Sequence, residues 1–254
     1  MPSLVTAPCW IDLSAKDVDA ASTFYGTVFG WSFPPQHPDA GDWRAAMVGH
    51  AFAGGISPRP EGMPVSMWTV FFGTPDINAA VARAHALGAA PMMPPMSVII
   101  DGVLMTTIAL MVDPVGAMFG LAQQAGNPGL THVGGRGSVS WYEYLSRDID
   151  VARGFYSDLL GAEIHPVPGS TTGYATLNVN GIDIAGTMAM PDTVPANVPA
   201  YWSFYLDVPD INEAIATMVD AGATLLMGPE PMQAGTFASM MDPEGAIINV
   251  LQSA

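Results

Sequence analysis

The sequence predicts an α+β protein made of two tandem copies of one domain, each of which reads β-α-β-β-β twice. Three blocks recur in one order at nearly constant spacing. They are Phe24-Tyr25 with Phe155-Tyr156, PDINAAVARAHALGA from Pro75 with PDINEAIATMVDAGA from Pro209, and DPVGAMFGLAQ from Asp113 with DPEGAIINVLQ from Asp242. The spacing of about 130 residues is far longer than a solenoid unit, so each copy is the size of a domain.

The elements of the first copy follow from local patterns. The apolar spacing from Asp17 to Phe29 predicts a helix that Asp17 caps and Gly30 ends. A second helix is expected at 76–87. The β-branched and aromatic run MWTVFFG predicts a strand at 67–73. Further strands are expected at 8–14, 43–49, 52–57, 89–93, 104–112 and 117–123.

The second copy repeats this order. Helices are expected at 148–160 and 210–221. Strands are expected at 139–146, 173–179, 182–188, 201–207, 223–227, 235–241 and 246–251. Between the copies lies AGNPGLTHVGGRG, which is rich in glycine and turn-forming residues. We therefore expect the first domain at 1–124, a linker at 125–136 and the second domain at 137–254.

Charge narrows the choice of partner. The chain of 254 residues has a formal net charge of −16 and only seven Lys and Arg residues. Nucleic acids and acidic membrane surfaces require a basic patch, so neither is expected as a partner. Phosphorylated ligands are disfavoured because few cations could hold them. We expect a hydrophobic small molecule that is neutral or cationic.

The single cysteine, Cys9, excludes an internal disulfide. The N-terminus has no basic start followed by an apolar stretch, and no run of 18 apolar residues occurs anywhere. The expectation is therefore a cytoplasmic protein in a reducing environment. Cys9 has no nearby nucleophile partner in the sequence and is expected to be a buried spectator.

In each copy a helix follows the first strand, Phe-Tyr lies near the end of that helix, a glycine follows, and a D-P-x-G segment precedes the last strand. This order resembles the vicinal oxygen chelate superfamily over nearly the whole chain, in two copies. That superfamily includes glyoxalases, bleomycin-resistance-type binding proteins and extradiol dioxygenases. The chain is most similar to the tandem-domain branch often labelled glyoxalase-like or hydroxylase. The resemblance implies paired βαβββ modules that form a half-open, cup-shaped mixed sheet around a small-molecule site. It also suggests a monomer or a homodimer, since tandem domains can satisfy internally the pairing that single-domain relatives achieve as dimers.

Metal-using members of the superfamily take their ligands from three inward strand positions in each half. The corresponding residues here are Trp10, Thr69, Gly120, Trp141, Ser203 and Asn249. None of them supplies the imidazole or carboxylate lone pairs that such sites need. We therefore expect no metal and no cofactor. The five histidines lie elsewhere and are expected to be surface or packing residues.

Alternation along a strand puts Trp10 and Asp12 on one face, as it does Trp141 and Glu143 in the second copy. A carboxylate among apolar side chains is desolvated, which raises its pKa and suits it to proton transfer. Glu143 and Asp12 are therefore the candidate general bases or acids, and Tyr205 could donate to a carbonyl. The alternative is a structural acid that accepts hydrogen bonds from its neighbours.

The remaining candidate residues are expected to bind the ligand. On the strands that open each second module, alternation places Thr69, Phe71 and Ser203 on the face toward the cup. A tryptophan recurs beside them at positions 68 and 202. Plain core packing is the alternative for the aromatic members. The predicted binding residues are Trp10, Trp141, Thr69, Phe71, Ser203, Asn249, Trp68 and Trp202.

Three hypotheses of function follow. The first is a metal-independent enzyme that acts on a hydrophobic, aromatic, natural-product-like molecule by acid/base chemistry. The second is a protein that binds or sequesters such a molecule without changing it. The third is a metal-dependent lyase or dioxygenase with a rearranged site held by Asp12 or Glu143. The second copy is favoured as the working one because it has the longer carboxylate and an amide at Asn249.

Overall fold

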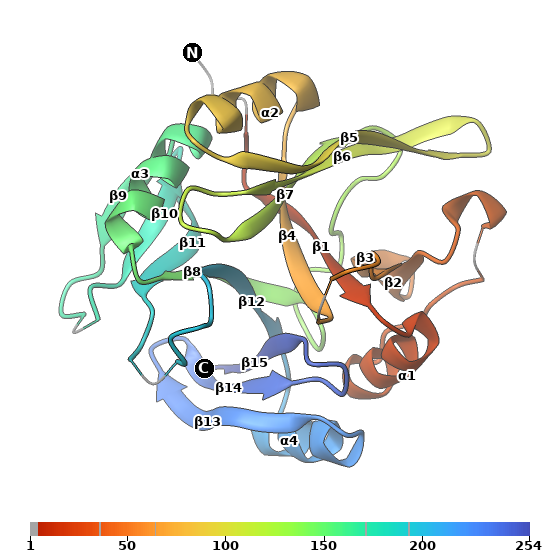
Figure 1. The fold of residues 1–254 in the computed structure, drawn as a ribbon. Coiled ribbons are helices and arrows are strands. Elements are labelled where there is room, and N and C mark those ends of the chain that lie inside the picture. Colours follow the sequence, from red (N-terminus) through yellow and green to blue (C-terminus); the bar gives the residue numbers. More distant parts are fainter. Residues whose placement is uncertain (1–4, 36, 64, 171, 193) are drawn as a thin grey trace. The chain divides into compact units, whose positions relative to one another are not determined.

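The computed structural model describes residues 5–35, 37–63, 65–170, 172–192 and 194–254. Figure 1 shows the fold. The elements of the first half are β1 Pro8–Ala15, α1 Val18–Phe29, a short 3-10 helix η1 Pro38–Ala40, β2 Arg44–Val48, β3 Ala51–Pro58, β4 Met67–Gly73, α2 Ile77–Ala86, β5 Ala90–Ile100, β6 Val103–Val112 and β7 Met118–Gln124.

The second half repeats this order with one additional strand. Its elements are β8 Val139–Ser146, α3 Ile149–Leu160, β9 Glu163–Pro166, β10 Ala175–Val179, β11 Ile182–Ala189, β12 Tyr201–Asp207, α4 Ile211–Asp220, β13 Thr224–Met232, β14 Gly235–Met241 and β15 Ile247–Ser253. The predicted α+β fold of two similar halves is confirmed. Three modules show the full β-α-β-β-β pattern, while the module of β1, α1, β2 and β3 has three strands among the described residues.

Each half contributes one mixed sheet. The strands of the first half follow the order β2-β3-β1-β4-β7-β6-β5, and those of the second half the order β13-β14-β15-β12-β8-β11-β10-β9. Within a module the first strand pairs in parallel with a later one, as β8 does with β11 and β12 with β15. The other strands continue as antiparallel hairpins. The parallel pairs place the first strand of each module inside its sheet.

Two compact units divide the chain differently from the two halves. The first unit contains Met1–Cys9, Val70–Pro128 and Trp141–Ser203, and the second contains Trp10–Thr69, Gly129–Ser140 and Phe204–Ala254. Each unit therefore combines one module from each half of the sequence. The expected domain boundaries at 124 and 137 remain a prediction.

The ends of α1 match the sequence pattern. Asp17 accepts a hydrogen bond from the backbone N–H of Ala20 at 3.0 Å, and Gly30 ends the helix with φ at 71°. The cap satisfies one of the free N–H groups of the first turn, and glycine takes the left-handed conformation without strain. In the second half, Asp148 precedes α3 without a side-chain cap.

Three parts of the sheets differ from the prediction, and one of them is β13, which continues to Met232 beyond the expected end at 227. The β5–β6 hairpin extends to the turn Asp101-Gly102, where both residues have positive φ. The predicted strand ended at 93, before Pro94 and Pro95, although an Asp-Gly pair between apolar runs is a strong hairpin signal. β5 tolerates both prolines because it lies at the edge of its sheet. The short strand β9 also had no predicted counterpart.

The repeated D-P-x-G segment provides a buried anchor in each unit. In the first unit, one oxygen of Asp113 accepts the backbone N–H groups of Val115 and Ala117. Its other oxygen accepts the hydroxyls of Tyr144 and Tyr156 at 2.7 and 2.9 Å. A buried carboxylate that receives four hydrogen bonds is fully satisfied, so this acid stabilises the core.

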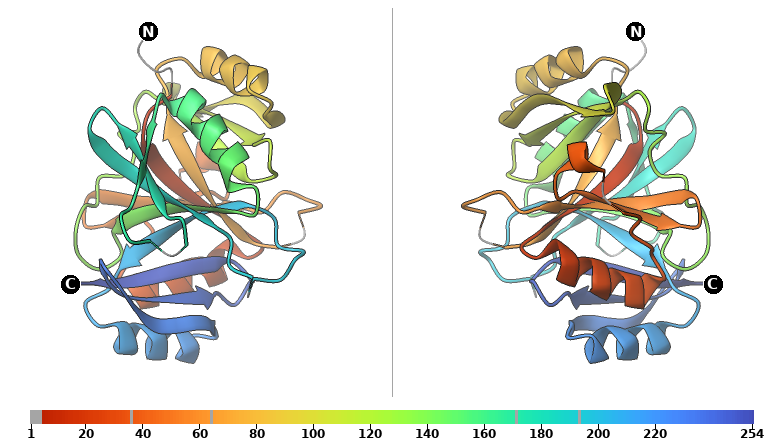
Figure 2. Two further views of the ribbon diagram at one scale, coloured as in Figure 1. Left: turned by 90° about the vertical axis from the view of Figure 1, so that its left-hand side faces the viewer. Right: turned by 90° about the vertical axis from the view of Figure 1, so that its right-hand side faces the viewer.

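The second unit uses the same arrangement. Asp242 accepts the hydroxyl of Tyr25, from α1, at 2.8 Å. The indole of Trp68 donates in turn to the Tyr25 oxygen at 2.9 Å. In the same unit α4 lies along β13 and β14 (Figure 2).

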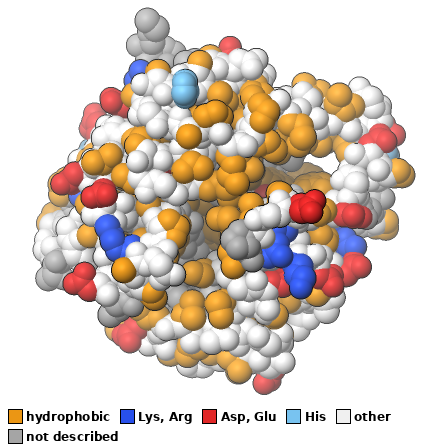
Figure 3. Space-filling view, viewed as in Figure 1, with side chains coloured by type: hydrophobic (Ala, Val, Ile, Leu, Met, Phe, Trp, Pro, Cys, Tyr) orange, Lys and Arg blue, Asp and Glu red, His pale blue; other side chains and the backbone are white. Residues whose placement is uncertain are grey.

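Part of the molecular surface is apolar. Along the β5–β6 hairpin Met92, Met96, Ile99, Val103 and Leu104 are 41 to 56% exposed. Figure 3 shows hydrophobic side chains gathered over this hairpin. In the described part of the chain, no helix has both the length and the apolar character needed to cross a membrane.

Candidate functional site

Asp12 lies in the second unit at the centre of a small aromatic cluster. The indole N–H groups of Trp10 and Trp43 both donate to its Oδ2, at 3.4 and 3.0 Å. The hydroxyl of Ser57 donates to its Oδ1 at 2.5 Å. The rings of Trp43 and Phe52 lie 6.4 and 6.0 Å from the ring of Trp10. Three donors therefore bind the Asp12 carboxylate.

Glu143 occupies the equivalent place in the first unit, and its side chain is buried, with 5% exposure. The hydroxyl of Tyr174 forms a hydrogen bond with the Glu143 carboxylate. The indole of Trp141 donates to that same hydroxyl at 2.8 Å. A chain of hydrogen bonds thus leads from an indole through a phenol to a buried carboxylate. We call Trp141, Glu143 and Tyr174 the phenol–carboxylate cluster.

A glycine makes room for each cluster. Gly55 pairs with Asp12, and Gly186 pairs with Glu143, each on the parallel neighbouring strand. A Cβ atom at Gly186 would lie 1.8 Å from the hydroxyl oxygen of Tyr174, and one at Gly55 would lie 2.3 Å from the carboxylate of Asp12. Any larger residue would displace the side chain above it, so the two glycines are part of the site.

The electrostatics follow from burial. Burial raises the pKa of the Asp12 carboxyl, although the hydrogen bonds from Ser57, Trp43 and Trp10 oppose this effect. Burial, and then the neighbouring charge of Glu143, raise the pKa of the Tyr174 phenol. The same two causes raise the pKa of Tyr201, the first residue of β12, which neighbours β8 in the sheet. Both phenols therefore remain protonated at neutral pH.

The two clusters correspond position by position, with the second 131 residues after the first. Trp10 corresponds to Trp141, Asp12 to Glu143 and Gly55 to Gly186. At three positions the chemistry changes: the indole of Trp43 becomes the phenol of Tyr174, Phe52 becomes Asp183, and Ser57 becomes Met188. Sequence reasoning identified the acids but missed Tyr174 and Gly186. The offset of 131 leads from Trp43 to Tyr174 and from Gly55 to Gly186, but no local sequence signal singles out Trp43 or Gly55 as a starting point.

The positions that hold metal in the superfamily do not fit a metal here. At Gly120 a carboxylate side chain has no space, because a Cβ atom would lie 2.1 Å from the ring of Phe71. Asn249 is engaged on both sides: its Oδ1 accepts from Ser239 at 2.6 Å and its Nδ2 donates to the carbonyl of Phe204 at 3.3 Å. Trp10 and Trp141 offer N–H donors rather than lone pairs.

The other predicted residues are placed as follows. Thr69, Phe71 and Ser203 are buried, with 3 to 7% exposure. Tyr205 pairs with Asn249 on the neighbouring strand of the second unit, and its ring meets Phe237 at 5.9 Å. Glu143 belongs to the first unit and Tyr205 to the second.

The two recurring tryptophans lie in the helix-packed core. Trp68 donates to Tyr25 of α1, and Trp202 donates to Tyr156 of α3 at 2.7 Å. Their indole N–H groups are thus already bound within the protein. Cys9 is partly buried, and burial raises the pKa of its thiol to about 12, which leaves it un-ionised at neutral pH.

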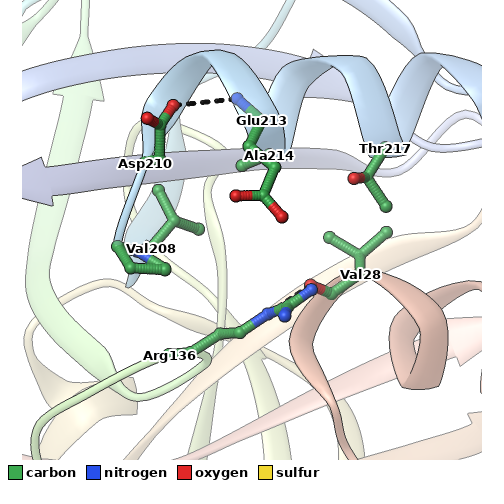
Figure 4. Close-up of a pocket in the computed structure, with 8 residues that line it drawn as sticks. Val28, Arg136, Val208, Asp210, Glu213, Ala214 and Thr217 are labelled. Carbon is green, nitrogen blue, oxygen red and sulfur yellow. Dashed lines mark hydrogen bonds between the residues drawn. The ribbon is translucent and has the colours of Figure 1, made fainter.

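Two clefts of the second unit lie away from the predicted residues. Figure 4 shows one of them, where Arg136 donates to the carbonyl of Val28 at the end of α1, opposite Glu213 of α4. Its volume of about 10 Å³ admits no more than a water molecule. The other is an open depression of about 520 Å³ beside Lys16 and Arg59, and its charged lining does not suit a hydrophobic ligand.

The comparisons with known proteins agree with this architecture. The family model described as a glyoxalase-like domain matches the chain twice, at residues 10–122 and 144–251. The chain belongs to the glyoxalase-like domain family. Both matches fall on the repeated β-α-β-β-β pattern, so the vicinal oxygen chelate resemblance is confirmed.

Relatives of this glyoxalase-like protein include CFP32 of Mycobacterium bovis, which carries the name of a glyoxylase. The two are 30% identical, and the match covers 97% of this chain and 95% of that protein. The anthracycline biosynthesis protein DauV of a Streptomyces species is also 30% identical, with 97% of this chain and 93% of that protein covered.

Solved structures share the fold at low identity. The Mn(II)-bound glyoxalase from Novosphingobium aromaticivorans has a TM-score of 0.67 at 17% identity, over 98% of this chain and 83% of that one. An extradiol ring-cleaving dioxygenase from B. fuscum has a TM-score of 0.64 at 14% identity, over 100% of this chain and 74% of that one. At this identity the likeness supports the fold alone.

Proposed function

We propose that this glyoxalase-like protein is a metal-independent enzyme that moves a proton on a hydrophobic, aromatic small molecule, with Glu143 as the acid/base group. The hydrogen bond between the buried Glu143 and the Tyr174 phenol is the observation that carries the proposal. A phenol oxygen accepts one hydrogen bond while its O–H donates another, so Tyr174 can link Trp141 to Glu143, whereas an indole N–H only donates. The second copy therefore has the chemistry that the first copy lacks.

The roles of the residues follow from their positions. Glu143 accepts a proton from a C–H or O–H group of the substrate and returns it to the product. The phenols of Tyr174 and Tyr201 stay protonated, since burial and the Glu143 charge raise their pKa values. Tyr174 steadies the carboxylate while Glu143 is charged. Isomerisation, hydration and ring opening all need such a proton transfer and no external oxidant.

The proposed substrate class rests on composition and on the relatives. A net charge of −16 disfavours anionic ligands, and hydrophobic residues form half of the chain. DauV and DnrV, from Streptomyces, are named for anthracycline biosynthesis. We therefore propose a neutral or cationic aromatic natural product of the anthracycline type as substrate. Such planar ring systems bind well against aromatic and aliphatic walls.

The test is a comparison of two matched variants. Anthracycline-type ring systems that raise the melting temperature are incubated with protein, and the products are followed by liquid chromatography and mass spectrometry. Glu143→Gln should lower turnover by about 10²–10⁴-fold, the usual share of general acid/base catalysis. Asp12→Asn, the equivalent change in the first copy, should leave turnover within about twofold. Equal losses in both variants, or undiminished turnover in Glu143→Gln, would reject the assignment.

The second candidate function is binding without chemistry, and the Asp12 cluster favours it. Trp10, Trp43 and Phe52 present aromatic rings beside a carboxylate, an arrangement that attracts a cationic or planar guest. Stoichiometric binding, with the ligand recovered unaltered after long incubation and with equal affinity in Glu143→Gln, would establish this function instead of the enzyme.

A further inference from the structure

Arg153, on α3, makes three hydrogen bonds to the backbone and side chain of one small region. Its Nη2 donates to the carbonyl of Gly173 at 2.5 Å and to the carbonyl of Thr187 at 3.1 Å. Its Nε donates to the Oγ1 of Thr187 at 3.0 Å. The side chain of Arg153 is only 17% exposed, and Asp150 lies 3.8 Å away on the same helix.

The residues that Arg153 binds are chain neighbours of Tyr174 and of Gly186, the glycine under the Tyr174 hydroxyl. Gly173 directly precedes Tyr174, and Thr187 directly follows Gly186, over which the Tyr174 hydroxyl is packed. The Thr187 hydroxyl also donates to the carbonyl of Ala175 at 3.0 Å, which joins the same two backbone segments. The guanidinium therefore fixes the distance between the backbone that carries the phenol and the backbone beneath it.

The choice of arginine is informative in a chain with seven Lys and Arg residues. A guanidinium presents several N–H groups in one rigid plane and can bind several acceptors at once, which a lysine cannot do. Hydrogen bonds from a charged donor are also stronger than neutral ones. In the first copy the equivalent residue is Ser22, whose hydroxyl donates to the carbonyl of Val18 in its own helix. The arginine is thus present in the copy that has the phenol, and a serine replaces it in the copy that has an indole at that position.

We propose that Arg153 is a positioning residue that holds Tyr174 in hydrogen-bonding distance of Trp141 and Glu143. The inference deepens the proposed function and rests on it for its catalytic meaning, since Arg153 acts through the phenol and touches no substrate. The geometry it predicts can be measured without any substrate.

The experiment follows the six tryptophan indole N–H signals by ¹H–¹⁵N NMR on the full chain. The Trp141 signal is assigned with Trp141→Phe. In Arg153→Gln it should move upfield and exchange with water about tenfold faster, as expected for the loss of one hydrogen bond. Arg153→Lys keeps the positive charge but not the planar set of N–H donors, so it should give an intermediate shift. The matched control is Arg44→Gln. Arg44 directly follows Trp43 in the chain and is ion-paired to Asp19, so its loss should leave the Trp141 signal unchanged.

Several outcomes would overturn the inference. One is an unchanged Trp141 signal in folded Arg153→Gln, and another is full restoration of the native signal by lysine. If Arg153→Gln does not fold, an unshifted signal in Arg153→Lys is decisive against it. The proposed function fails separately, when Glu143→Gln keeps its turnover while the Trp141 signal still responds to Arg153. When both hold, Arg153→Gln should lower kcat with little change in KM.

Discussion

Replacing Asp12 separates the role of its shape from the role of its charge. In Asp12→Asn the amide oxygen can take the place of Oδ2 and accept both indole N–H groups. The amide nitrogen then donates to Ser57, whose hydroxyl rotates to accept. Both indole N–H groups keep an acceptor, the Ser57 O–H gives up its own, and the desolvated charge is removed. In Asp12→Ala both indole N–H groups and the Ser57 hydroxyl lose their acceptor.

The magnitudes follow from these partners. Each unsatisfied buried donor costs about 1–3 kcal/mol. The Trp10 contact of 3.4 Å is already long, and Trp43 is only half-buried, so both should fall at the low end. Asp12→Ala should therefore lower the free energy of unfolding by about 2–4 kcal/mol. Asp12→Asn should stay within about 1 kcal/mol of the parent protein at pH 4.

The direction of the pKa shift of Asp12 determines how the free energy of unfolding depends on pH. Burial raises the pKa of Asp12 in the folded state. The parent protein therefore has the full benefit of a protonated Asp12 below the pKa of the unfolded chain, near 3.9. It loses this benefit as the pH rises through the folded pKa. Asp12→Asn has no such loss, so its stability relative to the parent should increase from pH 4 to pH 7.

Urea denaturation at both pH values, followed by tryptophan fluorescence and by circular dichroism, measures these differences. The reasoning is refuted if Asp12→Asn destabilises the protein as much as Asp12→Ala at pH 7, since the ionised carboxylate would then be a net stabiliser. Parallel pH curves for the parent and Asp12→Asn would show that Asp12 titrates alike in the folded and unfolded states.

Three further predictions concern the phenol–carboxylate cluster and the metal. Gly186→Ala should displace Tyr174 and cost about 1–3 kcal/mol, because the new Cβ would lie 1.8 Å from the phenol oxygen; unchanged melting and an unchanged Trp141 indole signal would contradict the packing. Tyr174→Phe should reduce turnover and leave the stability contributed by the Asp12 cluster intact. In the double variant with Asp12→Asn, the two changes in the free energy of unfolding should then add. Dialysed protein incubated with Fe(II), Mn(II), Ni(II) or Zn(II) should retain less than about a tenth of an equivalent by elemental mass spectrometry; near-stoichiometric metal would restore the third hypothesis, with Asp12 or Glu143 as ligand.

Much of the fold could be predicted because duplication presents each signal twice. The strands at 139–146, 201–207 and 235–241 coincide with β8, β12 and β14, and Asp17 caps α1 as its position indicates. The length of β5 could not be predicted from local pattern, since its prolines are compatible with a strand only at a sheet edge. Whether a strand lies at an edge depends on partners distant in the sequence.

The site was predictable in part for a related reason. Strand alternation is a local property, so Trp10 with Asp12 and Trp141 with Glu143 could be assigned to one face each. Tyr174 lies 31 residues after Glu143, and it is brought above Gly186 by the pairing of β10 with β11 and of β11 with β8. Arg153 likewise gives no sign of its role in the sequence, because its partners are two backbone carbonyls and a threonine.

The difference between the two copies is the strongest argument for a single working site. Both copies keep the indole, the acid and the glycine, so the framework of the cluster serves the fold whether or not chemistry occurs. In the first copy, two indoles and a serine bind the carboxylate in a closed set of partners. In the second, methionine replaces the serine, a phenol replaces the indole, and an arginine fixes the phenol. A purely structural role would be fulfilled by the first arrangement twice. The combined changes at Tyr174, Met188 and Arg153 replace an indole and a serine with one phenol that is held in place, and this phenol steadies the charged form of Glu143 that acid/base catalysis requires.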